Sequence, residues 1–204
     1  MEDQNVFYRN ETLRSIYKRH SIRMFTDRNV AEDDIMTILN AANHAPSAHN
    51  QQSWRFIVLK EEKKNELIKL VVGHSGKLPR PTSALLRMAA RSIASAPVVI
   101  AVMNTGQLIQ RGPDLFEMEK ESARDFFRIM EIQSSAAAVE NMMIAATSIG
   151  LGSVWLGILI MVQEEVLTFL GNPNGEFMAV VPVGYPVKSS SGPKKRSLDV
   201  VCQI

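Results

Sequence analysis

The sequence predicts a single domain of mixed helix and strand structure. Its 204 residues are enough for one well-buried core. Short apolar runs typical of buried strands alternate with longer segments in which apolar residues recur at helical spacing. Apolar residues make up 46% of the chain and charged residues 22%, which are usual values for a globular protein. No internal repeat is present, so we expect one domain over residues 1–204.

Helices are predicted where apolar residues recur three or four positions apart. The clearest short helix is Val30–Ala42, whose first turn is acidic as the helix dipole favours. Within it, Ile35, Ile38 and Ala42 fall on one apolar stripe. The other predicted helices are Thr12–Lys18, Glu61–Val72, Ser83–Ser95, Glu119–Ile149 and Gln163–Leu170.

Strands are predicted at short apolar runs bounded by turn residues. Glycine and proline predict irregular backbone at Gly73–Thr82 and Thr105–Asp114, and a tight turn at Asn172–Gly175. The predicted strands are Phe56–Leu59, Pro97–Met103, Ser153–Gly157, Phe177–Val183 and Leu198–Cys202.

The longest predicted helix, Glu119–Ile149, contains neither proline nor glycine. At 1.5 Å per residue it would span about 45 Å, more than one domain of this size needs. The small side chains of Ser134–Ala138 would let another helix approach closely. We expect it to pack against a second long helix from a partner subunit. The alternative is an ordinary core helix broken near Asp125.

Charge and cysteine content restrict the partners and the compartment. A formal net charge of +2 is too small to indicate a nucleic-acid partner. The lone Cys202 excludes an intrachain disulfide, which fits a reducing cytosol. The N-terminus has no features of a signal peptide, and the longest uncharged apolar run, Val154–Val162, is far shorter than the roughly 20 residues of a membrane span. We expect a cytoplasmic protein without a membrane partner.

Two basic clusters indicate a phosphate site. Arg19, Ser21 and Arg23 supply two guanidinium groups and a hydroxyl within five residues, and arginine binds phosphate through two parallel hydrogen bonds. The second cluster, Lys194–Arg196, follows a Ser/Gly/Pro-rich tether and could return to the same anion. Taken alone, the two arginines could equally be solvated or cap the preceding helix.

Two further segments are rich in backbone groups that could contact a ligand. The Pro46–Asn50 loop precedes an apolar strand, although by itself it could simply be a turn after a helix. The Gly150–Gly157 segment is not a dinucleotide-binding loop, because Trp155 stands where that motif needs its third glycine and no helix follows.

Other site chemistries have no support in the sequence. The four histidines do not have the spacing of metal ligands, and no cysteine pair accompanies them, so no metal site is predicted. Gly73–Gly76 does not have the nucleophile-elbow pattern of a serine hydrolase.

Four segments together resemble the FMN-dependent nitroreductase family. They are Arg-His-Ser-Ile-Arg-Met-Phe at 19–25, Ala-Pro-Ser-Ala-His-Asn-Gln-Gln-Ser-Trp at 45–54, Gly-Leu-Gly-Ser-Val-Trp-Leu-Gly at 150–157 and the basic tail, in the family's order. Ser53 departs from the family's usual proline. The resemblance implies an α+β sandwich, with a central mixed or antiparallel sheet flanked by helices. It also implies an obligate, intertwined homodimer with two FMN at its interface, in which the tethered tail 188–204 reaches the partner subunit.

The resemblance also assigns roles to individual residues. According to the resemblance, the two basic clusters bind the FMN phosphate, and which of Lys194, Lys195 and Arg196 does so is left open. Arg23 contacts either the phosphate or the flavin N1–O2 edge. The resemblance also implies that the Pro46–Asn50 loop contacts the flavin of the other subunit. It further implies that a backbone amide of the Trp155–Gly157 segment faces flavin N5. The implied cofactor contacts are Arg19, His20, Ser21, Arg23, Pro46, Ser47, Ala48, Asn50, Trp155, Leu156, Gly157, Lys195 and Arg196.

The implied reaction needs no catalytic side chain, because flavin N5 carries the chemistry. NAD(P)H would reduce FMN and leave, and a nitroaromatic, a quinone or another small-molecule electron acceptor would then take its place, which gives ping-pong kinetics. Two alternatives stay open. One is a specialised enzyme of the same fold, flavin-fragmenting or dehalogenating, and the other is a non-enzymatic FMN-binding redox module.

Overall fold

The structure, a computed structural model, describes residues 8–116 and 119–201. Over these residues the strands form a four-stranded sheet in the order β1-β2-β4-β3. All its strand pairs are antiparallel, so of the two predicted kinds of sheet, the antiparallel one is confirmed. The strands are β1 (Trp54–Leu59), β2 (Val98–Asn104), β3 (Gly152–Ser153) and β4 (Glu176–Gly184).

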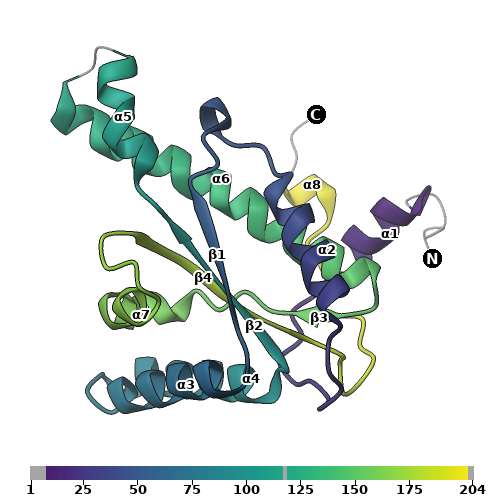
Figure 1. The fold of residues 1–204 in the computed structure, drawn as a ribbon. Helices are drawn as coiled ribbons and strands as arrows, with labels where there is room; N and C mark the ends of the chain where they lie inside the picture. The colour runs from purple at the N-terminus through teal and green to yellow at the C-terminus, as the bar shows by residue number, and fades with distance from the viewer. Residues whose placement is uncertain (1–7, 117–118, 202–204) are drawn as a thin grey trace.

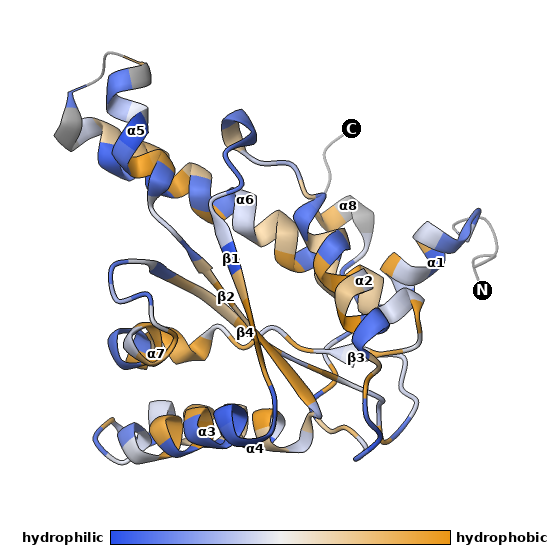
Figure 2. Cartoon of the chain, in the orientation of Figure 1, coloured by the Kyte–Doolittle hydropathy of each residue, from blue (hydrophilic) through white to orange (hydrophobic). Residues whose placement is uncertain are grey.

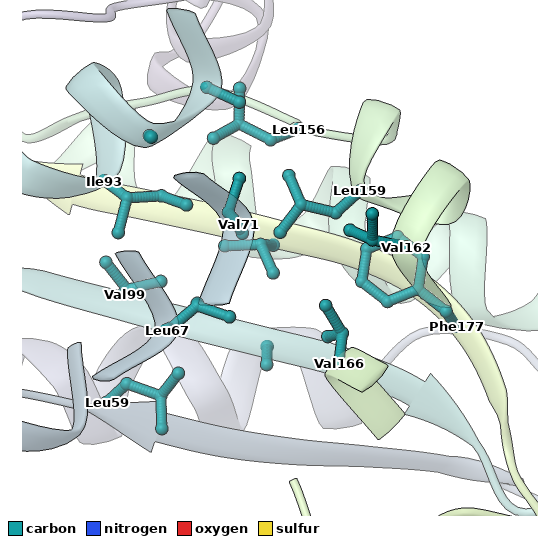
Figure 3. Close-up of a cluster of buried hydrophobic side chains, with 14 of the residues drawn as sticks. Leu59, Leu67, Val71, Ile93, Val99, Leu156, Leu159, Val162, Val166 and Phe177 are labelled. Carbon is teal, nitrogen blue, oxygen red and sulfur yellow. The ribbon is translucent and has the colours of Figure 1, made fainter. Parts of the chain in front are cut away.

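Helices cover both faces of the sheet, as the α+β sandwich requires (Figure 1). Side chains of the central strand β2 alternate between the two faces, and all of them are buried. Val99, Ala101 and Met103 join one core cluster (Figure 3), and the alternate side chains of β2 join the other. Helices α3 (Glu61–Ser75), α4 (Arg80–Ser95) and α7 (Gln163–Phe169) pack on the first cluster, and α2 (Glu32–Asn43) and α6 (Lys120–Ser148) on the second.

Hydrophobic residues concentrate on the sheet and on the helix faces turned toward it (Figure 2). In α2, Ile35, Ile38 and Ala42 are buried, which is the stripe predicted from their spacing. The predicted helix at 12–18 is α1 (Glu11–Lys18). Within the described residues, no helix combines the length and the apolar character that crossing a membrane requires.

The long helix α6 is continuous over 29 residues. The alternative of a break near Asp125 is therefore wrong. Its buried face packs against α2 and the sheet, while its N-terminal part extends beyond the sheet together with α5 (Figure 1). Packing against a partner's helix stays a prediction.

The predicted loop at Gly73–Thr82 is wrong over most of its length, because α3 continues to Ser75 and α4 begins at Arg80. Gly73 is tolerated within a helix whose packing supplies stability. Pro81 lies in the first turn of α4, where a missing N–H group costs little.

The predicted irregular stretch at Thr105–Asp114 is also wrong. It contains helix α5 (Gln107–Leu115), which includes Pro113. Gly112 is needed there because a Cβ atom at this position would lie 2.4 Å from the ring of Phe127 on α6. A local breaker signal is thus overridden by packing between two helices.

Two predicted strands are corrected. The run Ser153–Gly157 forms only the short β3 and an isolated bridge between Leu156 and Val180, and it leads into the 3-10 helix η3 (Ile158–Val162). The run Leu198–Cys202 is helical, as α8 (Leu198–Val201), and Cys202 lies outside the described residues. In α8 the Val200 amide donates to the Ser197 carbonyl, which closes a turn where no strand is paired.

Candidate functional site

The basic segment after α1 is held against the edge of the sheet by its backbone. The Ile22 amide donates to the Ser153 carbonyl at 2.9 Å, and the Thr26 amide to the Tyr185 carbonyl at 2.8 Å. The close approach requires Gly152, because a Cβ atom there would lie 2.8 Å from Ile22. These contacts fix residues 19–25 beside β3 and the chain that follows β4.

One pocket gathers the basic residues of both ends of the chain. It has a volume of about 380 Å³, and the C-terminal tail forms one of its walls. Its lining residues are Arg19, His20, Ser21, Arg23, Ser190, Ser191, Gly192, Pro193 and Lys195. Lys194 and Arg196 are not among them. The pocket thus presents three basic side chains and several hydroxyl groups, the donor set that suits a phosphate.

Arg19 is oriented by an acidic partner on α6. Its Nε atom lies 3.2 Å from Glu140 Oε1, and its side chain is only 18% exposed, whereas Glu140 is 48% exposed. This pairing uses one edge of the guanidinium group. The remaining N–H groups stay available to an anion in the pocket.

A second, smaller pocket of about 180 Å³ adjoins the Trp155–Gly157 segment. The Leu156 amide is already used by the Val180 carbonyl at 2.9 Å. The amide groups of Trp155 and Gly157 have no protein acceptor in the described part of the chain. The lining residues are Arg23, Leu85, Met88, Ala89, Ser92, Trp155, Leu156, Gly157 and Ile158.

Arg23 lines both pockets, so this residue lies between the cationic pocket and the largely apolar one. Helix α4 contributes a wall of the smaller pocket that was not predicted from the sequence. Leu85, Met88 and Ser92 recur at helical spacing on one face of that helix, which is the signal that could have found it. Leu85 and Met88 are half exposed, at 50% and 52%.

The segment 45–53, called the Pro-Ser loop, lies apart from both pockets. Pro46, Ser47, Ala48 and Asn50 line neither of them. The loop contains the 3-10 turn η2 (Ala48–Asn50), and three of its residues have left-handed backbone although none is glycine. Such strained conformations concentrate at functional sites. The three are His49 (φ 52°), Asn50 (φ 50°) and Gln52 (φ 51°).

Contacts with α6 and α5 fix the shape of this loop. The Ala48 amide donates to Ser134 Oγ at 3.1 Å, and the His49 ring lies 4.7 Å from the ring of Phe116. Within the loop, the Gln52 amide donates to Ser47 Oγ at 3.0 Å. The loop is therefore preformed, although it lines neither of the two pockets described above.

Beneath the loop lies a buried carboxyl group, Glu131. Burial raises its pKa, and the backbone amide of Leu108 and the side chain of Ser53 oppose that rise by favouring the charged form. Within the described residues, no group of three or more metal-ligating side chains is present. This buried carboxyl group thus supports the loop and lines neither pocket.

The chain is similar to known proteins over most of its length. The family model described as Nitroreductase family matches residues 16–185. A protein of Archaeoglobus fulgidus, provisionally named NADH dehydrogenase/NAD(P)H nitroreductase, is 31% identical over 179 residues, which is 86% of this chain and 86% of that relative. The Bacillus subtilis FMN reductase that uses NAD(P)H is 25% identical over 187 residues, covering 89% of this chain and 68% of the relative.

Among solved structures, a protein of Desulfovibrio desulfuricans provisionally named as a nitroreductase was determined in complex with FMN. It is 27% identical, with a TM-score of 0.71, and the alignment covers 95% of this chain and 95% of that one. The arrangement of sheet and helices described above is thus shared over almost the full length of both chains.

Proposed function

Since this chain belongs to the nitroreductase family, we propose that it is an NAD(P)H-dependent oxidoreductase that binds FMN across the two adjoining pockets. The observation that carries this proposal is the position of Arg23, which lines both. A ligand with a phosphate at one end and a planar ring at the other would place the ring's polar edge near this guanidinium group. The FMN-bound structure of the Desulfovibrio relative supports the same cofactor.

The residues of the larger pocket fit the phosphate end of FMN. Arg19 and Lys195 bring positive charge from the two ends of the chain, and the Ser21 hydroxyl adds a donor. Charge-assisted hydrogen bonds of this kind are about twice as strong as neutral ones. FAD fits less well, because the pocket suits a terminal phosphate with two free negative charges.

The residues of the smaller pocket fit the ring end. Leu85, Met88 and Leu156 supply apolar surface that excludes water, and the Gly157 amide is left with a free hydrogen. When bound, FMN supplies a carrier that accepts a hydride from NAD(P)H and passes electrons on. The chain's own part is to hold the ring, to donate the Gly157 N–H toward it, and to place the Arg23 charge where negative charge develops.

We also propose that a second copy of the chain completes the site. The Pro46–Asn50 loop is preformed and strained, yet it lines neither pocket of its own chain. In the homodimer this loop reaches the flavin of the partner subunit. This gives Pro46, Ser47, Ala48 and Asn50 their role as cofactor contacts, and α6 its partner helix.

The acceptor is a small planar molecule such as a quinone or a nitroaromatic. The rim of the ring pocket is apolar and half exposed, which suits stacking of a flat compound and selects weakly among such compounds. Hydride donor and acceptor use the same face in turn, which gives ping-pong kinetics.

The test is an anaerobic titration of the flavin-loaded protein with NADH and NADPH, followed by addition of a quinone. We expect the visible absorbance of the flavin to bleach with one of the two donors and to return with the quinone. A flavin that neither donor bleaches would contradict the proposed activity and indicate a binding module. Bleaching without reoxidation by quinones or nitroaromatics, but with loss of halide from a halogenated phenol, would indicate the dehalogenating alternative.

A further inference from the structure

The imidazole ring of His20 is engaged on both sides by atoms of the chain itself. Its Nδ1 atom lies 2.8 Å from the Lys18 carbonyl oxygen, and its Nε2 atom lies 2.6 Å from Ser190 Oγ. A carbonyl oxygen only accepts hydrogen bonds, so Nδ1 carries a proton and donates it. Nε2 is then turned to the Ser190 hydroxyl, and neither ring nitrogen is left for a ligand.

The tail touches the same ring a second time, two residues later. Gly192 has a left-handed backbone, with φ at 70°, and a Cβ atom there would lie 2.6 Å from the Cβ of His20. A side chain at position 192 would push the tail away from His20. The tail is thus held at Ser190 by a hydrogen bond and at Gly192 by close contact.

The rest of the tail has little else to hold it. Residues 188–197 have no helix or strand, and most of them are exposed. Ordering such a segment costs backbone conformational entropy, so the tail needs an anchor to stay in place. Lys195, three residues beyond Gly192, nevertheless lines the larger, cationic pocket, which is called the phosphate pocket below.

We propose that His20 is a positioning residue that fastens the C-terminal tail across the phosphate pocket and thereby sets Lys195 toward the phosphate. This rests on the proposed function in one respect, namely that the phosphate belongs to FMN. It gives His20 a role different from the direct phosphate contact that the family resemblance implies. The latch, defined here as His20 with Ser190 and Gly192, acts through Lys195.

A double-mutant cycle tests the latch. The variants His20→Ala, Ser190→Ala and the double variant are titrated with FMN and with riboflavin, which lacks the phosphate. We expect each single variant to bind FMN about tenfold more weakly, because the released tail no longer holds Lys195 in its charge-assisted contact with the phosphate. The double variant should be no weaker than the single ones, and riboflavin affinity should not change. Ser189→Ala, the neighbouring serine outside the pocket, is the matched control and should bind FMN normally.

The Lys195→Ala background separates a positioning role from direct contact. If His20 acts through Lys195, adding His20→Ala to that background changes FMN affinity less than twofold. If His20 contacts the phosphate itself, His20→Ala costs as much in that background as in the parent, and the inference is wrong. Additive losses in the His20–Ser190 cycle would overturn it as well.

A second measurement does not depend on flavin. Trypsin cleavage within Lys194–Arg196 should be faster in His20→Ala and Ser190→Ala than in the parent or in Ser189→Ala, since the tail is released. Equal cleavage rates would mean that no latch exists, even in a protein that binds FMN. A parent protein that binds no FMN but shows the expected cleavage pattern would refute the proposed function and leave the latch standing.

Discussion

Glu131 on α6 holds the first turn of α5 in place, because its Oε1 atom accepts a hydrogen bond from the Leu108 backbone amide at 2.7 Å in a buried position. The same carboxyl group lies next to Ser53, at the end of the Pro-Ser loop. The Ser53 carbonyl in turn accepts a hydrogen bond from the Thr105 amide at 2.8 Å. One side chain therefore joins the loop, α5 and α6 into a single unit.

The first prediction concerns the pH dependence of stability at Glu131. Burial raises the pKa of this carboxyl group in the folded state above its ordinary value of 4.5. The folded protein then binds more protons than the unfolded chain just above that pH. The free energy of unfolding should therefore fall as pH rises from about 4.5 through the raised folded pKa, and stay level above it. Urea unfolding of the parent across this range measures the slope.

Two variants at Glu131 separate charge from hydrogen bonding. Glu131→Gln keeps an oxygen acceptor for the Leu108 amide and should lose this part of the pH slope. Glu131→Ala leaves that amide without a partner and should lower the free energy of unfolding by about 1–3 kcal/mol at a pH where the parent's carboxyl group is protonated, and by less above its raised pKa. The same slope in Glu131→Gln as in the parent would mean that other groups cause it.

The second prediction compares two glycines within helices. Gly112→Ala should destabilise the protein by about 1–3 kcal/mol. The added methyl group would lie 2.4 Å from ring carbons of Phe127 and would force α5 and α6 apart. Gly73→Ala on α3 is the control, since nothing lies within 4 Å of its added Cβ. That variant should gain about 0.5–1 kcal/mol. Equal effects of the two variants in thermal unfolding would refute the close packing of α5 on α6.

The third prediction concerns Arg19. Arg19→Ala should weaken FMN binding by about 1.5–3 kcal/mol, through loss of a charge-assisted phosphate contact, and should leave riboflavin binding nearly unchanged. Arg14→Ala removes an arginine of α1 that pairs with Glu11 outside the pocket, so it controls for net charge. Fluorescence titrations measure both affinities. Equal losses in the two variants would show that only long-range charge matters.

The N-terminal part of the candidate site could be predicted from the sequence because its residues are neighbours in the chain. Arg19, Ser21 and Arg23 stay together in almost any backbone conformation, so their clustering needed no tertiary information. The sequence also predicted that the C-terminal tail returns to the site, where Lys195 lines the larger pocket and Arg196 does not. The α4 wall was not, because Leu85 and Met88 contact the site only through the packing of α4 beside η3.

The errors in the predicted elements have a common physical cause. Gly112 and Pro113 are local breakers, and only contacts with residues far along the chain, Phe127 and Glu131, make α5 stable. Likewise, the run at 198–202 has high β propensity, but its described part, Leu198–Val201, forms a helical turn and pairs with no strand of the described residues. Propensity is a weak guide where tertiary contacts decide.

The fourth prediction concerns the backbone amide of Gly157. Gly157→Val should slow flavin reduction by NAD(P)H more than it weakens FMN binding, because a branched side chain would disturb the backbone amide that we propose donates toward the flavin ring. An added Cβ meets only Trp155, at 3.5 Å, which is ordinary contact, so the fold should be preserved. Stopped-flow reduction and FMN titration give the two numbers. Proportional losses in both would make Gly157 a packing residue.

The fifth prediction concerns assembly. The chain should form a dimer at micromolar concentration, since the preformed Pro46–Asn50 loop lines neither pocket of its own chain. Obligate interfaces of this kind bury more than about 2,000 Å². Light scattering measures the mass directly. A stable monomer that binds FMN fully would remove the role of the loop across the interface.

The most direct test of the central claim is the flavin content of the purified protein, measured from its absorption spectrum and by chromatography of the released cofactor. With Arg23 joining a phosphate pocket to a ring pocket, the protein should purify yellow, or take up added flavin, with one FMN per chain and a clear preference over FAD and riboflavin. A well-folded preparation that neither carries FMN nor binds it when added would contradict the account.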